Sequence, residues 1–436
     1  MMTNVLPALA RARGITSVCS AHPLVIEAAL RHGLEAPQPV LIEATCNQVN
    51  HHGGYTGMTP ADFRRFVLDI ADRVGFDPAR ILLGGDHLGP NPWTSLPAAA
   101  AMVEAAAMVQ AYVEAGFTKL HLDTSMGCHG EPIALGNEVT AARAAQLAKA
   151  AEQAALASGL PPPSYVIGTE VPVPGGALEA IQDLEVTRAE SALETLRVHR
   201  EAFEAHGLRD AFGRVIAVVV QPGVEFGNAN VVVYDRDRAR ELSATLDQTQ
   251  GLVFEAHSTD YQPAAALKHL IADGFAILKV GPGLTFALRE ALYALDYIAD
   301  LLVPAADGAG PGLRVSMEAL MTLEPDNWKR YYHGDERQLF IQRHYSYSDR
   351  IRYYWNHPSA AAAVDRLFAR LEGVEVPETL ISQFLAPLYP QVSAGTVAAR
   401  PRDLCMAAVS HALKPYSEAT HAASTAVVGV SAASGQ

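Results

Sequence analysis

Cysteine is scarce in this sequence of 436 residues. None of the four cysteines forms a Cys-x-x-Cys pair, and buried free thiols are therefore favoured over a disulfide framework. Free thiols suit a reducing compartment, and the first 13 residues have no apolar core of signal-peptide length. We therefore expect a cytoplasmic protein. The cysteines are Cys19, Cys46, Cys128 and Cys405.

Excess positive charge and long uninterrupted apolar runs are also missing. The formal net charge is −14 at pH 7, and phosphate backbones repel such a surface, so no nucleic-acid partner is expected. The longest apolar stretch, residues 97–117, is interrupted by Glu104, Gln110 and Glu114. It predicts an amphipathic helix and not a membrane span, so no membrane partner is expected.

The first three hundred or so residues instead show a regular alternation. Short runs rich in Val, Ile and Leu are each followed by a turn signal and a helical pattern, and eight such units follow one another. Alternation of this kind predicts parallel strands joined by crossover helices, and eight units predict a (β/α)8 TIM barrel, an α/β fold. The strands are expected at 15–19, 40–44, 80–84, 118–123, 165–169, 215–220, 252–255 and 276–280.

A doubly wound open sheet is the alternative fold. It usually carries a Gly-rich phosphate fingerprint after its first strand, whereas this chain reads Cys19-Ser-Ala-His-Pro23 there. The pattern changes after the eighth unit. We expect a barrel over residues 1–303 that carries the metal and substrate site, a helical, aromatic-rich extension packed on it over 304–416, and a disordered tail over 417–436.

Polar side chains follow most of the expected strands, where barrel enzymes place their active sites. Four of them together could bind one divalent ion: His87, Glu170, Gln221 and His257. Imidazole, carboxylate and amide ligands suit Zn²⁺ most, with Mn²⁺ or Mg²⁺ as alternatives, and a set without cysteine favours a catalytic site with open positions. Any one of them alone could be a hydrogen-bonded structural residue, but their joint occurrence favours a metal site.

Asp86, beside that first histidine, is the expected proton-transfer group, because a metal that polarises a carbonyl needs a nearby base. The alternative for Asp86 is a turn or capping residue. Asp123 and Ser125 could likewise cap, orient substrate hydroxyls or support a metal ligand. The substrate-binding residues expected at the strand ends are Glu43, Asn47, Gln48, Asp123, Ser125, Asn228 and Asp260.

A phosphate site is expected in the loops after the seventh and eighth strands, as is common in barrels. Glycines there let backbone N–H groups approach an anion, and the following helix adds its positive end, although a tight turn alone could need the same glycines. An aromatic segment at 344–355 could close over the phosphate or could be a docking surface. The expected phosphate-binding residues are Ser258, Thr259, Lys279, Gly281, Gly283, Ser346 and Arg350.

Four stretches of the sequence resemble one known family. They are the segments 19–29, 43–60 (Glu-Ala-Thr-Cys-Asn-Gln-Val-Asn and Gly-Gly-Tyr-Thr-Gly-Met-Thr-Pro), 85–91 (Gly-Asp-His-Leu-Gly-Pro-Asn) and 349–355 (Asp-Arg-Ile-Arg-Tyr-Tyr-Trp). They resemble the so-called non-catalytic subunit of class II D-tagatose-bisphosphate aldolase, and the resemblance runs from about residue 14 to 415. It implies a β/α barrel. Some members support a separate aldolase subunit, and similar proteins are D-tagatose 6-phosphate 4-epimerases.

The barrel also resembles, more distantly, the zinc-dependent class II aldolases. The resemblance implies a catalytic Asp86 beside a metal-binding His87, and a second metal histidine at His257. Asp123-Thr-Ser125 resembles the Asp-x-Ser of those enzymes after the fourth strand. The departure is Gln221-Pro-Gly, which stands where those aldolases have a His-Gly pair, so a Gln or a Glu must complete the site.

These resemblances imply a metal-dependent epimerase that interconverts D-tagatose 6-phosphate and D-fructose 6-phosphate by retro-aldol chemistry. Asp86 would take the C4 hydroxyl proton, and Glu170, Asp260 or Asp123 would act on the opposite face. The alternatives are a stabilising, non-catalytic subunit of the aldolase and an active class II aldolase. The expected partners are a small phosphorylated ketose, an aldolase catalytic subunit and further copies of this chain in a homo-oligomer.

Overall fold

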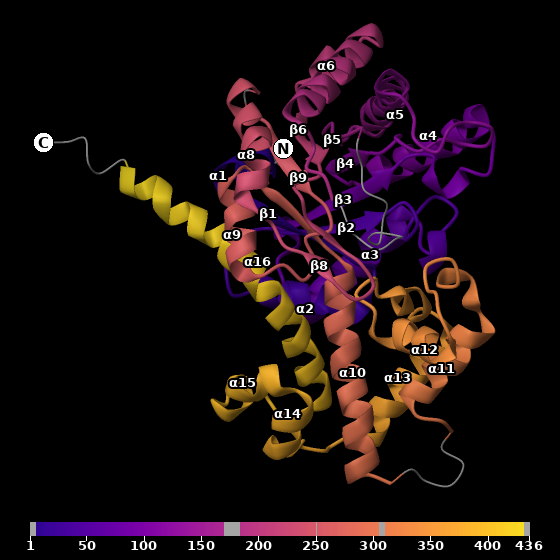
Figure 1. Cartoon of the computed structure of the whole chain (residues 1–436), viewed down its shortest axis with the longest axis vertical. Helices are drawn as coiled ribbons and strands as arrows, with labels where there is room; N and C mark the ends of the chain where they lie inside the picture. The colour runs from indigo at the N-terminus through magenta and orange to yellow at the C-terminus, as the bar shows by residue number, and fades with distance from the viewer. Residues whose placement is uncertain (1–5, 170–183, 250, 305–309, 431–436) are drawn as a thin grey trace, which may run out of the picture.

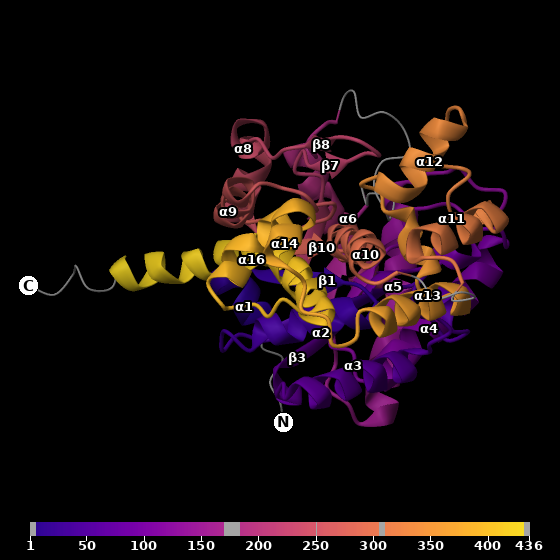
Figure 2. The ribbon, with the colours of Figure 1, turned by 90° about the horizontal axis from the view of Figure 1, so that it is seen from below.

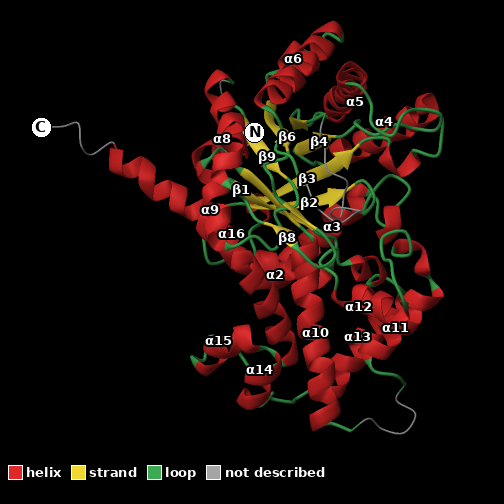
Figure 3. Cartoon of the chain, in the orientation of Figure 1, coloured by secondary structure: helices red, strands yellow, loops and turns green. Residues whose placement is uncertain are grey.

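Eight parallel strands form a closed barrel at the centre of the molecule (Figures 1 and 3), as the alternation predicted. The computed structural model describes residues 6–169, 184–249, 251–304 and 310–430. The strands lie around the barrel in chain order, and β1 pairs with β10 to close it. They are β1 (Ile15–Cys19), β2 (Val40–Thr45), β3 (Ile81–Leu88), β4 (Lys119–Leu122), β5 (Ser164–Ile167), β6 (Val215–Val220), β9 (Val253–Ala256) and β10 (Ile277–Val280).

Helices follow the strands and surround the barrel. Helix α3 shows how the sequence defines one: Thr59 and Asp62 form a reciprocal capping box at its start, Pro60 occupies the first turn, and Gly75, at φ 72°, ends it. The helices of the first seven units are α2 (Pro23–Gly33), α3 (Pro60–Val74), α4 (Ala98–Glu114), α5 (Asn137–Ser158), α6 (Ala189–Ala205) with the short α7 (Arg209–Phe212), α8 (Arg236–Ala244) and α9 (Ala264–Ala272).

The last helix of the chain completes this ring. Helix α10 (Pro282–Leu302) follows the eighth strand but runs away from the barrel, and α16 (Pro401–Val430) packs against α2, α9 and α10 (Figure 1). Tyr416 of α16 donates a 2.6 Å hydrogen bond to the carbonyl of Thr259 in the loop after β9. Leu404, Val409 and Leu413 are buried on the inner side of the helix. The final helix therefore lies between the helices of the first and seventh units.

Between α10 and α16 lies the helical extension, beside and below the barrel (Figures 1 and 2). Trp328, Tyr332, Tyr354 and Trp355 are buried in it, and Trp328 stacks on Tyr332 at 6.2 Å between ring centroids. Its helices are α11 (Leu313–Leu323), α12 (Glu336–Tyr345), α13 (Pro358–Arg370), α14 (Glu378–Phe384) and α15 (Tyr389–Ser393), with a 3₁₀ turn at Arg350–Tyr354.

The segment from residue 417, where a disordered tail is expected, begins as part of helix α16. Helix α16 continues to Val430, and residues 431–436 lie outside the described residues. The segment is rich in alanine, which favours helix once the preceding turns are anchored by packing. Figures 1 and 2 show the last turns extending away from the body of the molecule.

The amino end of the barrel is closed by α1 (Leu6–Arg13). Leu6 and Ala10 pack with inward-facing apolar residues such as Ile15, Leu41 and Ile216. This end of the barrel interior is therefore apolar. A two-stranded hairpin, β7 (Glu225–Phe226) and β8 (Val231–Val232), lies in the loop after β6. None of the helices in the described ranges combines the length and the apolar character that crossing a bilayer requires.

Candidate functional site

Beyond the apolar amino end of the barrel interior, the inward-facing side chains form two polar layers. Side chains alternate between the two faces of a strand, so residues two apart point into the barrel one above the other. In β4 this relates Lys119 to His121, and at the end of β9 it relates Glu255 to His257. We call the lower set the ionic layer (Glu43, Lys119, Glu255, Lys279) and the upper set the histidine layer (Asp86, His87, His121, His257).

The ionic layer is a buried set of two lysines and two glutamates. Lys119 Nζ lies 2.7 Å from Glu43 Oε1 and 2.8 Å from Glu255 Oε2, and Lys279 Nζ lies 2.6 Å from Glu43 Oε2. Burial opposes the charge on Lys119, but the two carboxylates outweigh it and raise the pKa of the ammonium. The layer therefore pairs each lysine with carboxylate oxygens of glutamate.

Gly84 makes room for this layer. It pairs with Glu43 across β2 and β3, and a Cβ atom at Gly84 would lie 2.7 Å from Cγ of Glu43. Such a contact is too close for two carbon atoms, so a side chain here would push the glutamate away from both lysines. The first glycine of Gly84-Gly85-Asp86 is therefore required by the ionic layer.

The histidine layer brings three imidazoles and one carboxylate together near the carboxyl ends of the strands. Ligand atoms of Asp86, His87, His121 and His257 all lie within 4.8 Å of one another. The ring centroids of His87 and His257 are 4.9 Å apart, and each lies about 5 Å from that of His121. All four residues are buried. Three nitrogens and an oxygen at this separation match the donors of a catalytic divalent-metal site.

A backbone irregularity places His87 in this group. Neighbours in a regular strand point to opposite faces, so Asp86 and His87 could not both face the barrel mouth. His87 has φ 51°, and the pairing of β3 with β4 shifts between Gly85 and Leu88. Non-glycine residues rarely adopt this conformation, and Ser258, which follows His257, has φ 54°. Backbone strain thus lies directly beside the histidine layer.

Carboxylates orient the imidazoles from outside the group. Asp123 Oδ2 lies 2.8 Å from His87 Nδ1, and Glu255 Oε1 lies 3.0 Å from His257 Nε2. A nitrogen that faces a carboxylate carries the proton, which leaves the other nitrogen of each ring with a free lone pair. Burial lowers the pKa of His257 to about 3, so this ring is neutral at physiological pH and able to bind a metal.

One ring nitrogen of His121 is available to a ligand. Its Nδ1 lies 2.9 Å from Asp86 Oδ1, whereas its Nε2 is buried and has no hydrogen-bond partner among the described residues. Buried polar atoms normally have a partner, and leaving one without costs about 1–3 kcal/mol. The donor set and this unpaired nitrogen therefore fit a borderline divalent ion such as Zn²⁺.

A pocket of about 90 Å³ opens above the histidine layer. Asp86, His87 and His257 lie at its base, and the helical extension contributes Arg352 and Tyr353 to its wall. Arg352 Nη2 donates a 2.9 Å hydrogen bond to the hydroxyl of Tyr353, whose ring packs edge-on against Tyr55. A half-buried guanidinium in the wall of a polar pocket is suited to an anionic group. The extension therefore completes the site that was expected from the barrel alone.

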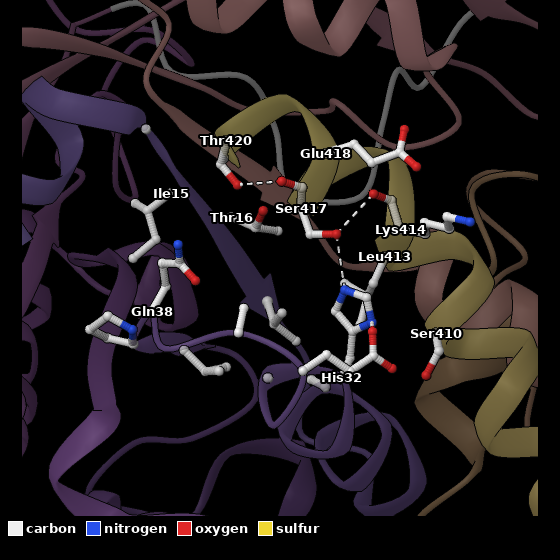
Figure 4. Close-up of a pocket in the computed structure, with 18 of the residues that line it drawn as sticks. Ile15, Thr16, His32, Gln38, Ser410, Leu413, Lys414, Ser417, Glu418 and Thr420 are labelled. Atoms are coloured by element: carbon white, nitrogen blue, oxygen red, sulfur yellow. Dashed lines mark hydrogen bonds and ion pairs between the residues drawn. The ribbon is translucent and has the colours of Figure 1, made fainter. Parts of the chain in front are cut away.

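A larger cavity, of about 680 Å³, lies at the other end of β1 (Figure 4). It is bounded by α2 and α16, where His32 Nε2 lies 3.0 Å from the hydroxyl of Ser417. No residue of the histidine layer contributes to its wall. Size alone would select this cavity, but the chemistry of the described residues selects the smaller pocket.

The chain is similar to known proteins over most of its length. The family model for "D-tagatose-1,6-bisphosphate aldolase subunit GatZ/KbaZ-like" proteins matches residues 7–421. The chain belongs to the GatZ/KbaZ-like family. It is 56% identical over 425 residues to D-tagatose 6-phosphate 4-epimerase of Agrobacterium fabrum, covering 96% of this chain and 99% of that protein. It is 51% identical over 403 residues to the aldolase subunit GatZ of Escherichia coli (strain SMS-3-5 / SECEC), covering 92% and 95%.

A crystal structure from Sinorhizobium meliloti 1021, described as a probable tagatose 6 phosphate kinase, is also similar to this GatZ/KbaZ-like chain. The two share 61% sequence identity with a TM-score of 0.87, over 93% of this chain and 100% of that one. The names of these three relatives share the tagatose skeleton but differ in the reaction. The chemistry must therefore be argued from the site.

The expected metal ligands of this GatZ/KbaZ-like chain need revision. His87 and His257 lie together, and Glu170 lies outside the described residues. Gln221 stays a prediction, and its Oε1 accepts hydrogen bonds from the N–H groups of Gly223 and Val224, both at 2.9 Å. Both lone pairs of that oxygen are used within the turn. His121, which the sequence reasoning missed, takes the third imidazole position.

Some of the residues expected to bind substrate line the pocket, and others do not. Asn47, Gln48 and Asp260 line the pocket. Glu43 does not, since it is fully buried in the ionic layer. Asn228 holds the extension instead, because its Oδ1 accepts hydrogen bonds from the hydroxyls of Ser346 and Ser348. Ser346, an expected phosphate ligand, is used in this same contact.

Asp123 and Ser125 contact each other and His87. The hydroxyl of Ser125 donates a 2.8 Å hydrogen bond to Asp123 Oδ1, while Asp123 Oδ2 faces His87. Burial works against the carboxylate, but hydrogen bonds and the histidines lower the pKa of Asp123 to about 2. The pair therefore orients the imidazole, and its expected contact with substrate stays a prediction.

The expected phosphate loop is largely filled by the protein itself. Asp260 Oδ1 accepts hydrogen bonds from the N–H groups of Gly281 and Gly283, at 2.9 and 2.7 Å, so an internal carboxylate already occupies the start of α10. Lys279 belongs to the ionic layer, and its Nζ is also 2.7 Å from Asp86 Oδ1. Thr259 donates its hydroxyl proton to the carbonyl of Lys279. Of the expected loop residues, Ser258, Lys279 and Gly281 line the pocket.

Arg350, an expected phosphate-binding residue, lies inside the extension and not at the pocket. Its guanidinium stacks on Tyr331 at 3.3 Å and its Nε donates to the carbonyl of Asn327, inside the extension. Arg352, two residues later, lines the pocket instead. Asp349, at φ 46°, begins the 3₁₀ turn that points the two side chains in different directions. The sequence offered no signal that distinguished the two arginines.

Proposed function

We propose that this protein is a metal-dependent sugar-phosphate 4-epimerase that interconverts D-tagatose 6-phosphate and D-fructose 6-phosphate. The observation that carries the proposal is the convergence of Asp86, His87, His121 and His257 beneath a pocket that also contains Arg352. The relative of 56% identity named as this epimerase supports the choice of substrate and reaction.

His87, His121 and His257 would hold a divalent ion, with Zn²⁺ favoured by the three imidazoles and Mn²⁺ or Mg²⁺ as alternatives. Such an ion supplies Lewis-acid polarisation of the ketose oxygens. The protein's own groups do the proton chemistry. Burial raises the pKa of Asp86, but Lys279 and His87 outweigh it and hold the pKa well below its usual range, so this carboxylate is ionised and can accept a proton.

The bond changes proposed for inversion at C4 are those of a retro-aldol step and its reverse. Asp86 accepts the proton of the C4 hydroxyl, the C3–C4 bond breaks, and its electron pair moves into an enediolate on C2 and C3. The aldehyde fragment rotates within the pocket. The C3–C4 bond then re-forms on the other face of the aldehyde, and the new C4 oxygen receives a proton. Direct removal of the C4 hydrogen is disfavoured because that hydrogen is not acidic.

The group that serves the opposite face must be a second carboxyl. Asp260 lines the pocket, and burial raises its pKa to about 6, which suits proton exchange near neutral pH. Asp123 is unsuitable because its oxygens are used by His87 and Ser125. Glu170 remains the alternative from outside the described residues. We assign the substrate phosphate to Arg352 and Ser258 in place of the glycine loop.

A non-catalytic, stabilising subunit of D-tagatose-1,6-bisphosphate aldolase is the second candidate. It is supported by relatives of 51% identity that are named as that subunit. An active aldolase is the third, and it differs from the epimerase only in that the fragments leave. A non-catalytic subunit would have no need for three oriented imidazoles, and for that reason we prefer an enzyme.

The deciding experiment supplies D-tagatose 6-phosphate to the purified protein with excess Zn²⁺, Mn²⁺ or Mg²⁺, and measures fructose 6-phosphate and triose phosphate separately. The epimerase yields fructose 6-phosphate without accumulation of triose phosphate. Release of triose phosphate would identify an aldolase. Absence of turnover with every metal, together with activation of a separate aldolase subunit, would establish the accessory role.

A pair of variants tests the site itself. Asp86→Asn should abolish turnover, because an amide cannot accept the hydroxyl proton. The matched control is Asp326→Asn, an exposed aspartate paired with Lys329 on the extension, which should turn over like wild type. Full activity in Asp86→Asn would remove that residue from the mechanism.

A further inference from the structure

A second cluster of metal-binding side chains lies on the surface, apart from the histidine layer. His51 and His52 follow β2, and Glu104 lies on α4. His51 Nε2 is 2.9 Å and His52 Nε2 is 2.8 Å from the same oxygen, Glu104 Oε2. The exposed fraction of these side chains rises from 19% for His51 through 33% for Glu104 to 62% for His52, so an ion could enter from solvent.

The loop that carries the two histidines is fixed without any metal. Asn50 Oδ1 accepts hydrogen bonds from the N–H groups of His52 and Gly54, and Asn50 Nδ2 donates to the carbonyl of Cys46. Gly53, at φ 105°, allows the tight turn that brings adjacent histidines to the same side. Preorganised ligands lose little conformational entropy on binding an ion, so most of the ordering cost is already met by the fold.

The charge and spacing of the cluster suit a cation. The cluster offers two imidazole nitrogens and one carboxylate oxygen, a donor set that divalent ions bind. The two imidazole centroids are 4.0 Å apart. Ligands of a tetrahedral zinc ion lie about 3.3 Å from one another, given metal–ligand bonds of about 2.0–2.1 Å. Shifts of about half an ångström would open this cluster to that spacing, and the exposed His52 is free to make them.

We propose that His51, His52 and Glu104 form a peripheral Zn²⁺ site, with solvent completing the coordination. The ion joins the loop after β2 to α4. The same loop supplies Asn47, Gln48 and Tyr55 to the pocket above the histidine layer. The peripheral site therefore fastens one wall of that pocket from outside. The proposal rests on the cluster alone and does not depend on the reaction that the pocket catalyses.

The first test counts ions. Untagged protein is stripped with a chelator, and Zn²⁺ binding is measured by calorimetry and by metal analysis after dialysis. His52→Ala should bind one Zn²⁺ fewer than wild type, and Glu104→Gln should bind the peripheral ion about 10- to 100-fold more weakly, because its charge is lost. His52 is largely exposed, so its replacement does not threaten the fold. An equal Zn²⁺ count in wild type and His52→Ala would overturn the proposal.

The second test uses Trp93 as a local reporter. Its ring centroid lies 5.4 Å from that of His51 and 6.3 Å from that of His52, whereas the other two tryptophans, Trp328 and Trp355, are buried in the extension. Cu²⁺, a quenching ion with high affinity for imidazole, should quench the fluorescence of wild type but not of Trp93→Phe or His52→Ala. His257→Ala, which damages only the histidine layer, should quench as wild type does. Equal quenching in wild type and His52→Ala would contradict a site at this position.

Discussion

The ionic layer and the histidine layer lie two residues apart on β4 and at the end of β9, yet their polar atoms are paired differently. In the ionic layer every charge has an opposite charge within 3 Å, as Lys119 has with Glu43 and Glu255. In the histidine layer the three imidazoles outnumber the one carboxylate, and His121 Nε2 has no hydrogen-bond partner among the described residues. Both layers are buried. Burial of polar groups therefore indicates function only where their bonding capacity is left incomplete.

The comparison predicts that breaking the ionic layer damages the fold. Lys119→Met leaves Glu43 and Glu255 with a single lysine between them, and an uncompensated buried charge costs about 3–5 kcal/mol. We expect a loss of that size in the free energy of unfolding, measured by urea denaturation. Lys329→Met, at an exposed ion pair, is the matched control and should leave stability unchanged. Equal stability of the two variants would show that the ionic layer contributes little to the free energy of unfolding.

Breaking the histidine layer should instead damage activity. His121→Gln can still donate a hydrogen bond to Asp86 but presents no imidazole nitrogen to an ion. We expect kcat/KM for D-tagatose 6-phosphate to fall about 100-fold, equivalent to about 2.7 kcal/mol of transition-state stabilisation, with a much smaller change in unfolding free energy. Steady-state kinetics and urea denaturation of the same preparation measure both. A variant that lost stability but kept kcat/KM would reverse the distinction between the layers.

Glu225 sharpens the comparison, because it is a buried carboxyl without a lysine. Burial raises its pKa from 4.5 to about 7. Because its pKa is higher in the folded state, Glu225 binds a proton more tightly there than in the unfolded chain. The stability that this protonation contributes is complete below about pH 4.5 and is lost as the pH rises toward 7. Between pH 5 and 8 wild type should therefore lose about 2 kcal/mol more stability than Glu225→Gln. Urea denaturation at both pH values measures the difference, and parallel losses would contradict the assignment.

Asp123→Asn tests the smallest effect, the orientation of one imidazole. The amide oxygen can still accept from His87 Nδ1 but no longer holds the proton there by charge. Loss of such an outer carboxylate typically weakens metal binding by about 10-fold or somewhat more. Competition with a chelating dye measures the affinity of the histidine layer for Zn²⁺. The peripheral site, monitored through Trp93, should be unaffected and serves as the internal control.

The sequence predicted those parts of the molecule that depend on local pattern. The barrel followed from the alternation of strands and helices, and Asp86, His87 and His257 followed from their places at strand ends. His121 was missed because it lies within a strand between Leu120 and Leu122. Its inward position becomes visible only when the two-residue period is continued from Lys119 to His121.

Contacts between residues far apart in the sequence could not be predicted from local sequence patterns. Lys279 precedes Gly-Pro-Gly and so resembled a phosphate ligand, but its partner Glu43 lies 236 residues away. The choice between Arg350 and Arg352 depended on the backbone conformation at Asp349. In each case the residue types were identified correctly, and a contact made only in three dimensions decided what they do.

The position of α16 also constrains how the molecule is made. Its partners α2 and α9 belong to the first and seventh units, whereas α16 begins at Pro401, after all eight barrel strands. A nascent chain could therefore close its strands into a barrel before α16 is made, and apolar surface of α2 would face solvent until that helix emerged. Chaperone binding to this uncovered surface of α2 is the expected cost of covering it with a helix that is so distant in the sequence.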